Sequence, residues 1–105
     1  MTASAKTDKI TATAENGQVF TRRTARTYTH AVYIEVTYSD GTVENYEPTW
    51  AGRPDLKEKS LAKTAKSASH LQGKEVRNWD RESRSYTHTG IFCTKARAIA
   101  VPVNA

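Results

Sequence analysis

Two short segments of the chain repeat the same three reactive side-chain types at the same spacing. Arginine, tyrosine and histidine lie two residues apart in segment 26–30 (RTYTH) and again in segment 84–88 (RSYTH). On a β-strand, residues at this spacing point to one face. A guanidinium beside phenol and imidazole groups binds phosphate or carboxylate. Two such strands, if paired, would bring both sets into one anion-binding patch.

The same repeat also has a structural interpretation. Threonine and tyrosine are common in strands, and the face that carries the first histidine continues into Val32, Ile34 and Val36. An apolar continuation favours burial of that face. The sequence favours this interpretation and leaves the patch open as the alternative.

A clear hairpin signal surrounds the first segment. Residues 28–38 alternate between an apolar and a mixed face, and residues 42–47 form a return strand that ends at Pro48. Between the two strands, Asp40-Gly41 supplies the positive φ values that a two-residue hairpin turn requires. The pattern therefore predicts an antiparallel hairpin.

The remaining elements have weaker signals. Residues 10–14 and 19–24 flank Asn16-Gly17 and predict a short hairpin, while Pro54 and Gly73 suit the start and the stop of a helix over residues 55–71. The other patterns predict a loop over 48–54, a strand over 75–79, a turn over 80–83, a strand over 84–94, and over 95–103 either a strand or a short helix followed by an extended tail.

Together these elements predict an α+β fold, with an antiparallel sheet of about four or five strands and one helix packed on one face. We expect a single domain over residues 10–105, preceded by a flexible N-terminus at residues 1–9. The 105 residues are 37% hydrophobic and include one cysteine, Cys93, which we expect to be a small buried hydrophobic residue. No run approaches the roughly 20 apolar residues that span a bilayer, so we expect a cytoplasmic protein without a membrane partner.

Charge is distributed unevenly along the chain. The net charge is +5, with 16 Lys and Arg against 11 Asp and Glu. Between Arg26 and Arg53 there are four acidic residues and no basic one, so this stretch contributes −4 and the remainder contributes +9, from 16 basic and 7 acidic residues. Such polarity favours binding through one side of the molecule.

Nucleic acid is the first partner that this polarity suggests. Lysine and arginine neutralise phosphates, and aromatic side chains stack on unpaired bases. No known nucleic-acid-binding motif accompanies the basic residues. The predicted contact residues, which include three lysines that share one helix face, are Arg22, Arg23, Arg26, Tyr28, Lys59, Lys63, Lys66, Arg77, Arg81, Arg84 and Tyr86.

A protein partner is the alternative, with the chain acting as an inhibitor of a host or defence protein. Charge polarity also steers protein association. Tyr46 and Trp50, near Pro48, are the candidate anchors, because tyrosine and tryptophan dominate interface hot spots; their structural interpretation is packing beneath a loop. Exposed edge strands would also allow dimerisation.

An enzyme is the least favoured class, and we predict no catalytic residue, no metal site and no cofactor. A phosphoesterase with paired His-x-Thr/Ser motifs would need a hydroxyl two residues after each histidine. This chain has Val32 after His30 and Gly90 after His88. The sequence also lacks a glycine-rich phosphate-binding loop.

Segment 21–32 (TRRTARTYTHAV) resembles short uncharacterised proteins of actinobacteria and their phages. The resemblance covers these dozen residues. It implies a phage-type accessory role and assigns no activity and no site residues.

Overall fold

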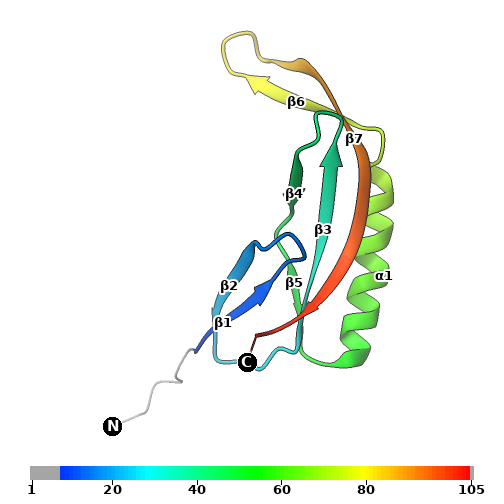
Figure 1. Cartoon of the computed structure of the whole chain (residues 1–105). Coiled ribbons are helices and arrows are strands. Elements are labelled where there is room, and N and C mark those ends of the chain that lie inside the picture. Colours follow the sequence, from blue (N-terminus) through cyan, green and yellow to red (C-terminus); the bar gives the residue numbers. More distant parts are fainter. Residues whose placement is uncertain (1–7, 105) are drawn as a thin grey trace.

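The strand patterns of the sequence fold into two antiparallel sheets and one helix (Figure 1). The computed structural model describes residues 8–104. In that range the elements are β1 (Asp8–Thr13), β2 (Val19–Thr24), β3 (His30–Tyr38), β4 (Val43–Asn45), β5 (Thr49–Ala51), α1 (Pro54–Leu71), β6 (Glu75–Asp80) and β7 (Ser85–Pro102). Strands β1 and β2 form a two-stranded sheet, and the larger sheet has five strands in the order β4-β3-β7-β6, with β5 also paired to β3. The predicted α+β class is confirmed.

Several predicted elements recur with shifted ends. Helix α1 begins one residue before the predicted start and ends at Leu71 as predicted, and β3 begins at His30 instead of residue 28. Residues 1–7 of the N-terminus predicted as flexible lie outside the described residues. The last two residues of that predicted segment, Asp8 and Lys9, belong to β1.

The turn between β3 and β4 is of a different type from the predicted one. Only the glycine of Asp40-Gly41 has a positive φ, at 88°. The N–H of Tyr38 donates to the carbonyl of Thr42, and the N–H of Gly41 donates to the carbonyl of Tyr38. The loop is therefore three residues long, with a left-handed glycine at its end. Asp40 favours this form because its Oδ1 accepts the N–H of Thr42 at 3.0 Å and the hydroxyl at 2.6 Å.

The sheet edge beside β3 is longer than predicted. Residues 49–51, predicted as part of a loop, form β5 and pair with β3 in the same antiparallel sense as β4. Pro48 lies between β4 and β5. A proline is tolerated on an edge strand because one side of that strand needs no N–H. The loop prediction is therefore wrong over residues 49–51.

Strand β7 resolves the undecided residues 95–103 in favour of a strand. One half of it, residues 93–102, pairs with β3, and the other half, residues 85–92, pairs with β6. This single strand of 18 residues belongs to the body of the molecule at one end and to a projecting hairpin at the other (Figure 1).

Alternate residues of β3 enter two small cores on opposite faces of the sheet. Ile34 and Val36 pack towards α1, in a cluster that includes Cys93. Tyr33 packs towards the β1–β2 hairpin, where its ring centroid lies 5.0 Å from that of Phe20. The burial of Cys93 confirms its prediction as a small buried residue.

Helix α1 packs loosely on the sheet. Ala68 is its one buried residue. Ser60, Thr64 and Ser67 line a groove of about 340 Å³ between the helix and the β4–β5 edge, because side chains this small do not fill the space. No helix within residues 8–104 combines the length and the apolar character needed to cross a membrane.

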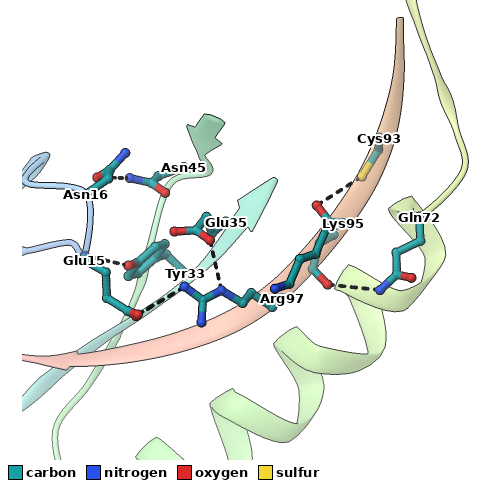
Figure 2. Close-up of polar contacts among 10 residues, drawn as sticks. Glu15, Asn16, Tyr33, Glu35, Asn45, Gln72, Cys93, Lys95 and Arg97 are labelled. Carbon is teal, nitrogen blue, oxygen red and sulfur yellow. Dashed lines mark hydrogen bonds and ion pairs between the residues drawn. The ribbon is translucent and has the colours of Figure 1, made fainter. Parts of the chain in front are cut away.

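A polar cluster ties the β1–β2 hairpin to the sheet (Figure 2). Arg97 of β7 donates through Nε to Glu35 of β3 at 2.9 Å and through Nη2 to Glu15 of the β1–β2 turn at 3.1 Å. The N–H of Glu15 donates to the Tyr33 hydroxyl at 3.1 Å. Because Glu35 already has a cationic partner, the acidic stretch 27–52 presents less free negative charge than its sequence total indicates.

Candidate functional site

The hairpin of β6 with the first half of β7 extends beyond the body of the molecule (Figure 1), and we call residues 75–92 the arm. In the arm, Arg77 pairs with His88 and Trp79 pairs with Tyr86. At its base the register shifts, and Gly90 in the shifted segment has a φ of 73°. Because a bulge bends the strand that carries it, the arm turns away from the body at this point.

One face of the arm carries an aromatic pair followed by a basic pair. The rings of Trp79 and Tyr86 lie 5.0 Å apart in a T-shaped arrangement, and the two residues are 54% and 59% exposed. Arg77 and His88, the next pair towards the body, are also exposed. Exposed aromatic residues of this size mark binding surfaces when they gather on one face. We call these four residues the aromatic face.

The tip of the arm adds two arginines. Arg81 and Arg84 are the first and last residues of the turn between β6 and β7. Arg84 has a φ of 51°, which makes it the non-glycine residue with positive φ among residues 8–104. Such a conformation costs about 1 kcal/mol and would suit glycine better. Arg84 is exposed at this position, so its side chain is open to a ligand.

Glu75 organises the base of the aromatic face. One of its carboxylate oxygens bonds to Nδ1 of His88 and lies 3.7 Å from Nε of Arg77, and the other accepts the N–H of Gly90 at 3.3 Å. The hydrogen bond from His88 is the main cause that lowers the pKa of Glu75 below its ordinary value, with Gly90 and the charge of Arg77 acting in the same direction and burial opposing them. Glu75 thereby positions both basic side chains beside the aromatic pair.

The charge of the arm is balanced. It contains three arginines and three acidic residues, so its net charge is zero with histidine neutral. Two of the three carboxylates already form hydrogen bonds within the arm: Glu75 bonds to His88, and Asp80 accepts the N–H of Glu82 at 2.9 Å. The arm therefore offers exposed rings and guanidinium groups without a strong positive field.

A second set of predicted residues gathers where β2 leads into β3, at the opposite end of the molecule. Together with one residue of β1 they form what we call the basic end: Lys9, Arg22, Arg23 and Arg26. Arg23 lies directly across from Lys9 in the β1–β2 register. None of the four forms an ion pair with another residue in the range 8–104.

The aromatic residues at the basic end support an arginine. Cζ of Arg22 lies 5.2 Å from the ring centroid of Tyr28, and the Tyr28 ring lies 6.4 Å from that of Trp50. Both rings are half-buried, and Trp50 packs against the core beneath the β1–β2 hairpin. At this end the rings are partly covered by the protein itself.

The predicted helix lysines lie between these two regions. Lys59, Lys63 and Lys66 are exposed on α1, and Lys63 lines the groove together with Tyr46, which is 37% exposed. The helix begins after β5, where the carbonyl of Ala51 accepts the N–H of Thr29 from the loop between β2 and β3. It ends near the base of the arm, where the N–H of Gly73 donates to the carbonyl of Cys93.

The two copies of the repeated motif do not form one patch: β3 and β7 are neighbouring strands, but the predicted side-by-side placement of the two copies is wrong. His30 pairs with Pro102, whereas His88 pairs with Arg77 in the arm. From residue 88 to residue 102, at about 3.3 Å per residue, β7 spans about 45 Å. The strand that carries the second copy continues past the end of β3, so the two copies lie at opposite ends of a molecule 56 Å long.

Trp79 and Lys9 are not among the contact residues that the sequence predicts. Trp79 lies at the end of the predicted strand 75–79, and the polar run 80–85 between Trp79 and Tyr86 is the signal that would pair them across a hairpin. Lys9 was assigned to the flexible N-terminus. Its role appears only with the register that places it opposite Arg23.

Within residues 8–104, no group of three or more His, Cys, Asp or Glu side chains is arranged to hold a metal ion. No protein-family model, curated protein sequence or solved structure matches the chain.

Proposed function

We propose that the protein binds single-stranded nucleic acid, with the aromatic face of the arm stacking on unpaired bases and the arginines of the arm contacting the sugar-phosphate backbone. The observation that carries this proposal is the Trp79–Tyr86 pair. Both rings are more than half exposed, and they lie opposite each other on a projecting two-stranded arm, beside Arg77. Stacking of a base on an aromatic side chain contributes about 1–3 kcal/mol and tolerates any base.

The ring geometry supports stacking. The ring planes of Trp79 and Tyr86 are inclined by 65° in an edge-to-face arrangement, so the edge of one ring covers one face of the other and each ring keeps at least one face uncovered by its partner. Each ring can therefore receive a base. Unpaired bases are the suitable ligand because bases inside a duplex are already stacked on their neighbours.

The test is fluorescence anisotropy of a labelled single strand of about 24 nucleotides, which at 3.4 Å per nucleotide exceeds the length of the molecule. Trp79→Ala and Tyr86→Ala are each expected to raise Kd about tenfold, in keeping with the loss of one stacked base. Val19→Ala is the control, since Val19 is an exposed hydrophobic residue of β2 outside the arm, and its Kd should equal that of the wild type. Absence of binding at low salt, or equal affinities for all variants, would refute the proposal.

A protein partner is the second candidate, and the balanced charge of the arm favours it. Three acidic residues accompany the three arginines there, and acidic groups repel phosphates. An accessory role of phage type, as the resemblance of segment 21–32 implies, is compatible with either partner. Pull-down from a nuclease-treated lysate separates the two: a protein retained by the wild type and lost with Trp79→Ala supports a protein partner, whereas retention only without nuclease supports nucleic acid.

A further inference from the structure

We infer that the basic end is a second contact for the same nucleic-acid strand, so that one strand is held at both ends of the molecule. The inference rests on the proposed function of the arm. It assigns a role to Lys9, Arg22, Arg23 and Arg26, which lie far from the aromatic face.

Charge is the first reason. The arm has no net charge and supplies rings, whereas the basic end has four cations against Asp8, which gives +3. Affinity for nucleic acid comes largely from neutralised phosphates. A strand stacked on the arm would therefore gain most of its electrostatic binding energy if it also reached the basic end.

The arrangement of the four cations is the second reason. Like charges directly opposite each other on paired strands destabilise the pair, and Lys9 and Arg23 are placed in that way. Arg22 is held over the Tyr28 ring, which leaves its guanidinium edge free for hydrogen bonds. A phosphate beside Lys9 and Arg23 would relieve their repulsion, and a second phosphate would meet the positioned guanidinium of Arg22 on the other face of the hairpin.

The dimensions are the third reason. The molecule is 56 Å long, a length that about 16 nucleotides cover at 3.4 Å each. A strand of at least this length can therefore contact the arm and the basic end at the same time.

Strand length provides the test. Wild-type protein should bind a single strand of about 24 nucleotides at least tenfold more tightly than one of about 6, because two linked contacts raise the effective concentration of the second. In the double variant Arg23→Gln/Arg26→Gln, the long strand should bind about tenfold more weakly. The slope of log K against log salt concentration should become shallower by about 1.4, which is about 0.7 for each of the two lost phosphate contacts. The affinity for the short strand, measured by quenching of tryptophan fluorescence at high ligand concentration, should not change.

The control is Lys57→Gln/Lys95→Gln, which removes the same charge from α1 and from the body of β7 and should leave the length dependence intact. Equal binding of both strands by the wild type, or equal weakening of both by the basic-end variant, would overturn the inference. The proposed function fails separately, if Trp79→Ala has no effect at either length. Circular dichroism verifies that the exposed arginine changes leave the fold intact.

Discussion

The arm and the basic end are built from the same residue types, which they present to solvent in different ways. Each has a Tyr–Trp pair: the rings of Trp79 and Tyr86 lie 5.0 Å apart and those of Tyr28 and Trp50 lie 6.4 Å apart. On the arm both residues are more than half exposed. At the basic end both are half-buried, and Arg22 covers one of them. Burial therefore distinguishes an aromatic pair that is open to solvent from one that supports a neighbouring cation.

The largest expected effect comes from removing the tryptophan at each end. Trp50→Ala should lower the free energy of unfolding by about 3 kcal/mol, because a large side chain that packs on the core leaves a cavity. Trp79→Ala should lower it by about 0.5 kcal/mol, the value of one cross-strand pair, while weakening nucleic-acid binding. Urea unfolding followed by circular dichroism measures both. Equal losses of stability in the two variants would show that the Tyr28–Trp50 and Trp79–Tyr86 pairs contribute equally to the fold, which contradicts this prediction.

A medium effect is expected at the tip of the arm. Arg84→Gly removes the strain of a positive φ and should raise the free energy of unfolding by about 1 kcal/mol, while weakening binding of a single strand several-fold. Arg81→Gly is the matched control, since Arg81 lies in the same turn without positive φ and its replacement should give no gain in stability. If Arg84→Gly leaves binding unchanged, the strained arginine has no part in the interface.

The smallest expected effect is a pH dependence confined to the arm. The pKa of Glu75 lies below its ordinary value of 4.5, chiefly because of the hydrogen bond from His88. The stabilisation that Glu75 provides is therefore present above pH 4.5 and is lost as the pH falls through the lowered pKa. Amide and indole hydrogen exchange should quicken around Trp79 in this acidic range before it quickens around Trp50. Glu75→Gln should abolish this difference, and an unchanged profile in that variant would assign the effect to another group.

The fold was predictable where the signals are local. Pro54 and Gly73 delimit α1, and Asx-Gly pairs mark two turns, because capping and turn geometry depend on neighbours in sequence. The pairing of β3 with β7 joins residues far apart in the chain, so no local pattern could reveal it. That pairing also separates the two copies of the repeat.

The site was predictable only in part for the same reason. Residue type is enough to predict Arg77, Arg81, Arg84 and Tyr86 as candidate contact residues, and the pairing of β6 with β7 places them on one arm with Trp79. Residue type does not distinguish the exposed Tyr86 from the half-buried Tyr28. Exposure is a property of the tertiary structure, because it depends on which elements pack against a side chain.

The pairing of β7 allows the length of the arm to change without a change in the body of the molecule. Its body half is held by β3 and its outer half pairs in register only with β6, so a change in hairpin length beyond the bulge leaves the body untouched. Two residues added to each strand of the arm would carry the aromatic face outward by about 6.6 Å and keep it on the same side, because strand side chains alternate with a period of two. Natural or engineered variants of this chain can therefore differ in the spacing of their two ends while sharing one scaffold.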